Sequence, residues 1–247
     1  MRIYQLIAII GILSPSIVSA SSHGQQISGV LNYASTTKKV VALTFDADMT
    51  PKMLEELKSG KVNSWYNATV ISTLKKEHVP ATLFLTGMWI ETYTTTTKEL
   101  SDDPLFELGN HSYSHGGFRA PCYGLNITKE SNDNLEIEKT DALLKKYTTS
   151  YVKYFRFPGL CFDSKDVRKV EKHGYVVIGG NVRGGDGFQE NTKKIVSQVV
   201  DRVHSGSIVI LHMHGGPDAP QTANALPCII QKLRAKGFTF VKVSDLI

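Results

Sequence analysis

The chain has 247 residues, of which 41% are hydrophobic and 21% charged, and its formal net charge is +5. These values describe an ordinary soluble globular protein with enough length for one domain and a sizeable core. The basic residues are scattered in short pairs on helix-like segments, as in Lys75-Lys76 and Lys145-Lys146. Pairs of this kind are typical of solvated helix faces, so composition and charge argue against a nucleic-acid partner.

Residues 1–20 predict a secretory signal peptide. Arg2 supplies a positive start, an apolar run extends from Leu6 to Leu13, and small residues ending at Ala20 suit cleavage. The alternative is an uncleaved membrane anchor, but the apolar run is short for a spanning helix, which needs roughly 20 residues. No later segment is long and apolar enough to span a membrane. We therefore expect a secreted or cell-envelope protein without integral membrane contact after signal removal.

Residues 21–38 are polar and predict a flexible lead-in. From residue 40 onward, short β-branched apolar runs alternate with segments of helical periodicity. The predicted strands are 40–45, 81–86, 105–108, 151–157, 175–178, 207–211 and 238–243, and the predicted helices are 67–78, 135–147, 164–173, 193–204 and 222–236. This alternation favours an α/β fold with parallel strands, of the distorted, incomplete (β/α)7-barrel type, in one domain over 39–247.

Ionisable side chains collect at the predicted strand ends, where barrels of this type place their active sites. These residues are Asp46, Asp48, His111, His115, Arg156, Asp186, His212 and His214. For His214, a loop or substrate-contact role is favoured over a role as a ligand.

Two short motifs could build a metal site. His111 and His115 are four residues apart, so in a helical turn both imidazoles would point to one side. Asp46 and Asp48 share a face of an extended segment, so one could bind metal while the other acts as a base. Taken separately, the motifs also fit two partly exposed loop histidines and a pair of turn aspartates.

The three cysteines leave one pairing to test. Cys122 follows the histidine motif, and Cys161 follows the Arg-Phe-Pro-Gly segment at 156–159. If both segments line one cleft, Cys122 and Cys161 are candidates for a disulfide, which leaves Cys228 over. No Cys-x-x-Cys motif is present, so a cysteine-ligated zinc site is not expected.

Four segments occur in order at strand ends: Thr-Phe-Asp-Ala-Asp at 44–48, His-Ser-Tyr-Ser-His at 111–115, Arg-Phe-Pro-Gly at 156–159 and Ile-Leu-His at 210–212. This ordered set resembles the polysaccharide deacetylase family, also called carbohydrate esterase family 4, over about residues 40–247. The resemblance implies that 39–247 is a deacetylase-like catalytic domain. It also implies a divalent metal, with zinc favoured over cobalt or another ion, held by Asp48, His111 and His115.

The resemblance also implies the remaining roles. Asp46 would be the general base and Arg156 the residue that orients it. His212 would be the general acid that protonates the leaving amine, with Asp186 as its partner. At the substrate, the backbone N–H near Gly159 would help bind the oxyanion, and Leu211 would line the pocket for the acetyl methyl group.

The chain departs from the family pattern where Ala47 separates two aspartates that are usually adjacent. The usual aromatic of the arginine–proline motif is replaced by Gly159-Leu160, and the usual Asp-Trp becomes Asp186-Gly187-Phe188. The spacing leaves open whether Asp46 shares or exchanges the ligand role of Asp48. The other changes concern the shape of the substrate more than the reaction.

The resemblance implies a metal-dependent hydrolase that removes N-acetyl groups from an acetylated polysaccharide such as peptidoglycan, chitin or an exopolysaccharide. The alternatives are a non-catalytic glycan-binding homologue that contains the metal and an esterase that removes O-acetyl groups from xylan-like polymers. Asn67 and Asn126 begin glycosylation sequons, which matter only in a eukaryotic secretory pathway.

Overall fold

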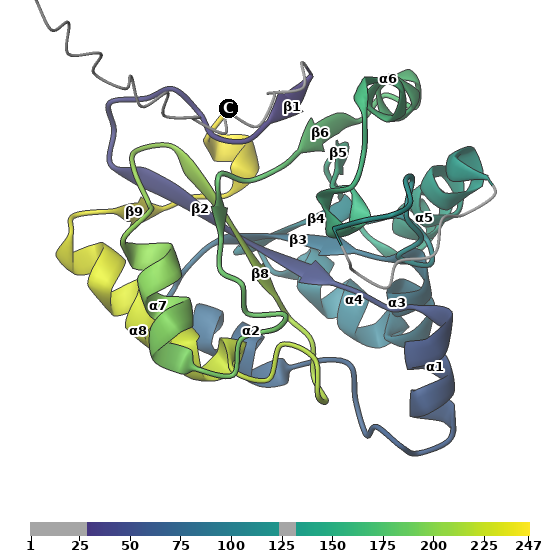
Figure 1. The fold of residues 1–247 in the computed structure, drawn as a ribbon, viewed down its shortest axis with the longest axis horizontal. Helices are drawn as coiled ribbons and strands as arrows, with labels where there is room; N and C mark the ends of the chain where they lie inside the picture. Colours follow the sequence, from purple (N-terminus) through teal and green to yellow (C-terminus); the bar gives the residue numbers. More distant parts are fainter. Residues whose placement is uncertain (1–28, 124–131) are drawn as a thin grey trace, which may run out of the picture.

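The computed structural model of the chain describes residues 29–123 and 132–247. Its strands form a parallel sheet that curls into an incomplete barrel with helices outside it, which confirms the predicted fold class (Figure 1). The described strands are β1 (Val30–Leu31), β2 (Val40–Ala47), β3 (Ala81–Leu85), β4 (Phe106–Asn110), β5 (Tyr154–Phe155), β6 (Val176–Ile178), β7 (Val182–Arg183), β8 (Ser207–His212) and β9 (Thr239–Phe240). Their order is β1-β6-β5-β4-β3-β2-β8-β7, and β9 also pairs with β2.

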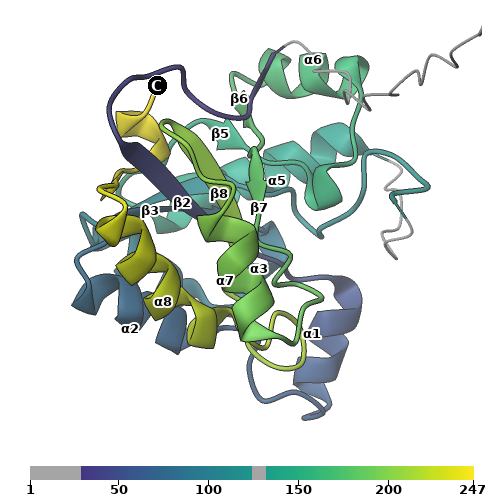
Figure 2. The same cartoon turned by 60° about the vertical axis from the view of Figure 1, so that its left-hand side comes forward.

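Helices cover the outside of the curled sheet. They are α1 (Pro51–Lys58), α2 (Ala68–Lys76), α3 (Gly87–Thr92), α4 (Thr94–Asp102), α5 (Asp133–Tyr147), α6 (Ser164–Lys172), α7 (Thr192–Val200) and α8 (Thr222–Ala235), with short 3-10 turns η1 (Pro158–Leu160) and η2 (Val243–Asp245). Helices α7 and α8 lie side by side in both views, next to α2, whereas α3, α4 and α5 pack together near β4 (Figures 1 and 2). Every helix in the described ranges is too short or too polar to cross a membrane.

The alternation of side chains along β2 separates the core from the site. Val41, Leu43 and Phe45 belong to the main hydrophobic cluster, which β2 shares with the surrounding helices. Thr44 and Asp46, between and beyond them, face the other side of the strand, the inside of the barrel. The central strand therefore anchors the core with one face and carries polar groups on the other.

Several elements differ from the prediction. Val30 and Leu31, in the segment expected to be a flexible lead-in, form β1 and pair with β6. Strands of two residues, such as β1 and β7, are too short to show an alternating pattern. Helix α1 went unpredicted although Thr50 caps it and Pro51 occupies its first turn, which is a readable start signal.

Two further helices had weaker signals. Helix α3 has six residues, of which the first four are buried, so it is too short to show a helical period, and α4 begins with a run of threonines, which are poor helix formers. The predicted signal peptide and the Asn126 sequon lie outside the described residues, whereas Asn67 caps α2 by accepting a hydrogen bond from the Thr69 N–H.

Candidate functional site

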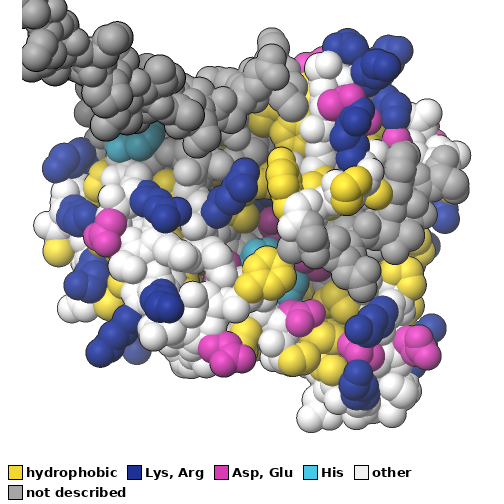
Figure 3. All heavy atoms as spheres, in the orientation of Figure 1, with side chains coloured by type: hydrophobic (Ala, Val, Ile, Leu, Met, Phe, Trp, Pro, Cys, Tyr) yellow, Lys and Arg dark blue, Asp and Glu magenta, His cyan; other side chains and the backbone are white. Residues whose placement is uncertain are grey.

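The ends of β2 and β8 place two pairs of ionisable residues side by side. The strands run parallel in register, with Asp46 opposite His212. Asp48 and His214 lie two residues further along, just beyond the ends of the strands, where they continue the same face. The residues between them, Ala47 and Met213, are buried in the main hydrophobic cluster. Figure 3 shows histidine side chains at the bottom of a hollow in the middle of this face of the molecule.

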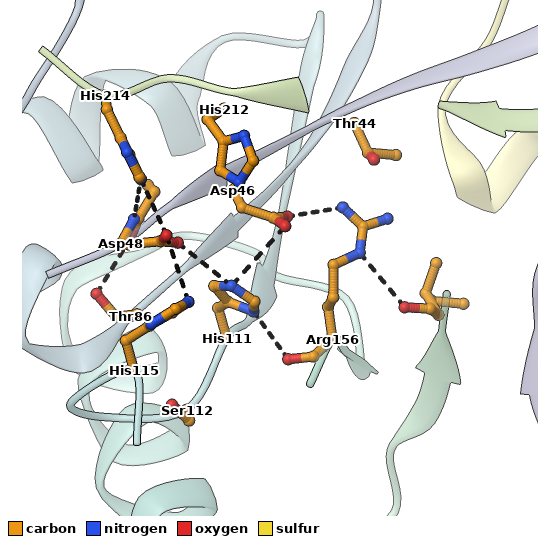
Figure 4. Close-up of polar contacts among 12 residues, drawn as sticks. Thr44, Asp46, Asp48, Thr86, His111, Ser112, His115, Arg156, His212 and His214 are labelled. Carbon is orange, nitrogen blue, oxygen red and sulfur yellow. Dashed lines mark hydrogen bonds and ion pairs between the residues drawn. The ribbon is translucent and has the colours of Figure 1, made fainter. Parts of the chain in front are cut away.

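The histidine motif follows β4, but it does not form the helical turn expected from its spacing. Residues 111–115 form an irregular turn in which Ser112 and His115 have positive φ values of 67° and 57°. This turn still brings the rings of His111 and His115 together, with their centroids 5.1 Å apart. Both side chains reach Asp48 (Figure 4).

Asp48, His111 and His115 offer a set of ligand atoms for one cation. Their candidate atoms lie within 4.8 Å of one another, and Nε2 of each histidine is 3.3 Å from an Asp48 carboxylate oxygen. His111 Nδ1 lies 2.8 Å from the carbonyl oxygen of Arg156, so Nδ1 carries a proton, and in the neutral ring Nε2 directs its lone pair toward Asp48. Asp48 Oδ1 is buried and accepts no hydrogen bond from any described residue. Converging lone pairs of this kind fit a divalent metal.

Burial and the neighbouring charged groups shift the pKa values of His115 and Asp48. Burial lowers the pKa of His115 to about 4, so its imidazole is neutral and able to bind metal at pH 7. Burial alone would raise the pKa of Asp48, but the neighbouring His115 and His214 hold it well below the usual value. The carboxylate is therefore ionised, as a metal ligand must be.

Asp46 is held beside the metal group by a buried arginine. Arg156 is fully buried, and its Nη1 donates to Asp46 Oδ1 at 2.7 Å while its Nη2 donates to the Gly179 carbonyl at 2.9 Å. The guanidinium also lies 4.0 Å from the centroid of the Phe84 ring. The second carboxylate oxygen, Asp46 Oδ2, remains 3.8 Å from His111 Nε2 and faces the site (Figure 4).

His212 has a carboxylate partner of its own. Asp186 Oδ1 lies 3.0 Å from His212 Nδ1, while Oδ2 accepts hydrogen bonds from the His212 backbone N–H at 2.8 Å and from Thr222 Oγ1 at 2.6 Å. Burial alone would lower the pKa of His212, but the Asp186 charge outweighs it and raises that pKa to about 10. The predicted pair is thus together in space, and it favours a protonated His212.

Gly159 and Leu211 lie in different settings. Gly159 has a φ of 58° within η1, a left-handed conformation that suits glycine, and η1 ends next to the Cys122–Cys161 disulfide. The proposed pairing is therefore present, with Cα atoms 5.6 Å apart, and Cys228 is free. Leu211, in contrast, is fully buried in the main hydrophobic cluster. The structure does not bring Leu211 to the site, because neighbours in a strand face opposite sides and His212 occupies the site face.

His214 is a site residue that the sequence analysis undervalued. Its Nε2 accepts a hydrogen bond from the Asp48 backbone N–H at 3.1 Å and lies 3.1 Å from Asp48 Oδ2. His214 lies in the loop after β8, as one of the expected roles requires, but its side chain is buried against Asp48. The signal was present in the sequence, because His214 repeats the spacing of His212 just as Asp48 repeats that of Asp46.

Known proteins resemble this chain over most of its length. A peptidoglycan-N-acetylglucosamine deacetylase of Bacillus cereus is 28% identical over 215 residues, which cover 85% of this chain and 89% of the relative. The structure of a family 4 acetyl xylan esterase from Clostridium thermocellum, in complex with a cobalt ion, aligns with a TM-score of 0.66 at 27% identity and covers 84% of this chain and 90% of that one.

A family 4 pseudoenzyme from Bacillus anthracis aligns with a TM-score of 0.71 over 88% of this chain and 68% of its own, at 24% identity, and supports the fold alone. Residues 33–178 match the family profile described as Polysaccharide deacetylase. That match spans more than half of the sequence and includes Asp46, Asp48, both histidines of the turn and Arg156. The chain therefore belongs to the polysaccharide deacetylase family.

Proposed function

We propose that this protein is a metal-dependent hydrolase that removes N-acetyl groups from the sugars of an acetylated polysaccharide of the peptidoglycan, chitin or exopolysaccharide kind. The observation that carries the proposal is that two proton-transfer groups with different partners lie next to one set of metal ligands. Asp46, held by Arg156, and His212, held by Asp186, occupy neighbouring positions at the ends of β2 and β8. Binding a glycan needs neither group, whereas hydrolysis of an amide needs both.

The metal ligands of the proposal are Asp48, His111 and His115, with zinc as the favoured ion. A cobalt ion accompanies the esterase structure described above, and a site with two histidines and one carboxylate accepts either metal. When bound, the ion polarises the substrate carbonyl and lowers the pKa of a water molecule. Asp48 and neutral His115 match such an ion in charge and in their lone pairs.

In the proposed reaction, Asp46 accepts the proton of the attacking water. Its carboxylate keeps one oxygen for this task because the other is held by Arg156. Arg156 thereby orients the base without touching the substrate.

His212 then donates a proton to the nitrogen that leaves. An amine leaves poorly unless it is protonated, and the contact with Asp186 keeps a proton on the ring. Donation takes place from Nε2, because Nδ1 is engaged by Asp186. The backbone N–H near Gly159 is the proposed partner of the oxyanion.

Release of acetate from a panel of acetylated glycans tests the proposal, together with identification of the bound metal. Wild-type protein should release acetate from N-acetylated sugars, lose this activity with a chelator and regain it when zinc or cobalt is added. Asp46→Asn should abolish release and leave metal binding largely intact, because this residue is proposed as the base and not as a ligand. Unchanged turnover in Asp46→Asn would show that Asp46 is not the general base.

The same panel separates the remaining alternatives. Faster release from acetylated xylan than from N-acetylated sugars would favour an O-acetyl esterase, the activity named for the Clostridium thermocellum relative. Glycan binding without any acetate release would favour a non-catalytic homologue. Export by a signal peptide, which the first 20 residues predict, would be tested by sequencing the N-terminus of the mature protein.

A further inference from the structure

The turn that carries the two histidine ligands has a backbone that it would not adopt by itself. Ser112 and His115 are both in the left-handed region, at φ values of 67° and 57°. This region is disfavoured for residues with a Cβ atom, and no glycine occupies the turn. Contacts from outside the turn must therefore hold it in the conformation that brings His111 and His115 together.

A buried carboxylate from α5 makes several of these contacts. Glu136 Oε2 accepts hydrogen bonds from the backbone N–H groups of Tyr113 and Ser114, at 3.0 and 2.9 Å. Its other oxygen, Oε1, accepts from Ser114 Oγ at 3.0 Å. Glu136 is only 6% exposed. Two successive backbone donors thus converge on one oxygen of a buried anion, which is a strong and directional arrangement.

Neighbouring residues of α5 extend the same contact surface. Thr140, one helical turn after Glu136, donates from Oγ1 to the Ser112 carbonyl at 2.8 Å. Asn110 bridges the two segments, because its side chain accepts from the Ser112 N–H at 2.9 Å and donates to the Ile137 carbonyl at 3.0 Å. The turn is therefore tied to one face of α5, and Glu136 supplies the charged part of this attachment.

We propose that Glu136 is a positioning residue for the metal site, which sets the affinity for the metal by holding the turn between His111 and His115. It acts through Tyr113 and Ser114 and touches neither histidine ligand in the contacts described above. This inference rests on the metal site of the proposed function but does not depend on the reaction. Partners of metal ligands typically change metal affinity by about 10- to 100-fold when they are removed.

The chain offers a closely matched control in Glu107 of β4. Glu107 is also a buried glutamate, at 8% exposed, and its Oε1 accepts from Thr82 Oγ1 at 2.7 Å and from the Ser244 N–H at 3.1 Å. It therefore combines a hydroxyl and a backbone donor as Glu136 does, but it holds η2 and not the histidine turn. Substitution at either position removes similar hydrogen bonds.

The experiment compares Glu136→Met, Glu136→Gln, Glu107→Met and Glu107→Gln. For each variant the Kd for zinc is measured by competition with a chromogenic chelator, and the Tm is measured for the metal-free protein. We expect Glu136→Met to weaken zinc binding by about 10- to 100-fold, with partial recovery in Glu136→Gln, whose amide oxygen can still accept from the turn. Both Glu107 variants should lower Tm and leave the zinc Kd unchanged.

A purely structural role for Glu136 predicts a different result, in which Glu136→Met and Glu107→Met lose similar amounts of Tm and neither changes the zinc Kd. That result, or an equal loss of affinity in the Glu107 variants, overturns the inference. If Glu136→Met does not fold, Glu136→Gln against Glu107→Gln decides the matter, with a weakening of about threefold or more expected only in the former. Because no turnover is measured, wild-type protein without deacetylase activity would refute the proposed function and leave this test intact.

Discussion

His115 lies in the turn after β4 and His212 ends β8, and the surroundings of these two partly exposed rings shift their pKa values in opposite directions. The pKa of His115 is lowered to about 4 by burial, which outweighs the charge of Asp48, a carboxylate that His115 shares with His111 and His214. The pKa of His212 is raised to about 10 despite burial, chiefly because Asp186 lies against its Nδ1, with smaller contributions from the charges of Asp48 and Asp46. Burial therefore leaves His115 neutral and free to bind metal, whereas the close contact with Asp186 keeps a proton on His212.

The largest effect is expected when one of the metal ligands is removed. His111→Asn removes a ligand whose Nδ1 is held by the Arg156 carbonyl, so both the bound metal and its polarising effect should be lost. Activity should fall by about 10³-fold or more. Metal content by mass spectrometry and acetate release should fall together. Retention of a full equivalent of metal would mean that His111 is not a ligand.

Removing the proposed general acid should lower activity but leave the metal bound. His212→Asn removes the proposed acid, and kcat for an N-acetyl substrate should fall by about 10²- to 10⁴-fold. The Kd for the metal should stay the same, because His212 is not one of the proposed ligands. An activated ester should lose less rate than the amide, since its leaving group needs less protonation. Equal losses on both substrates would contradict the role as acid.

A smaller effect is expected at His214, whose ring contacts both the metal ligand Asp48 and the ring of His212. His214→Leu removes the acceptor for the Asp48 backbone N–H, so the carboxylate should be less well placed and zinc affinity should fall about 10-fold. In His214→Gln the amide oxygen can replace the lost acceptor and restore most of the affinity. His173→Leu, a change at a partly exposed histidine at the end of α6, serves as the control. An unchanged Kd in His214→Leu would remove His214 from the site.

The smallest effect lies outside the site, on the helix that carries Glu136. Partial burial would raise the pKa of Asp141, but hydrogen bonds from Lys145, Lys153, Tyr175 and Tyr151 hold it well below the usual value. A lowered pKa contributes stability above the ordinary carboxyl pKa of about 4, and this contribution is lost as the pH falls below it.

Asp141→Asn should therefore lower the free energy of unfolding by about 1–2 kcal/mol at pH 7, since solvent screens part of the interaction. Urea titrations of both proteins at pH 7 and pH 3 measure the difference. It should shrink at pH 3, where the Asp141 contribution is partly lost. A constant difference at both pH values would show that the charge of Asp141 does not stabilise the fold.

Local patterns were sufficient for much of the site. The two-residue period along 44–48 puts Asp46 and Asp48 on one face, and a run of buried β-branched residues before them predicts the strand. The same rule, applied along β8, pairs His214 with His212 and turns Leu211 toward the core. The Cys122–Cys161 pairing also followed from the expectation that both segments line one cleft.

The helical turn assumed for His111 and His115 was wrong because i and i+4 spacing alone does not distinguish a helix from an irregular turn. Contacts between distant segments hold that turn, and Glu136 lies 23 positions beyond its partner Tyr113 with no local signal linking them. The sequence by itself thus determined which residues end the strands and which way they face, since both follow from the period of the chain. Only the tertiary structure decided which carboxylate each histidine meets and which helix holds the metal-binding turn, because those choices depend on how the elements pack.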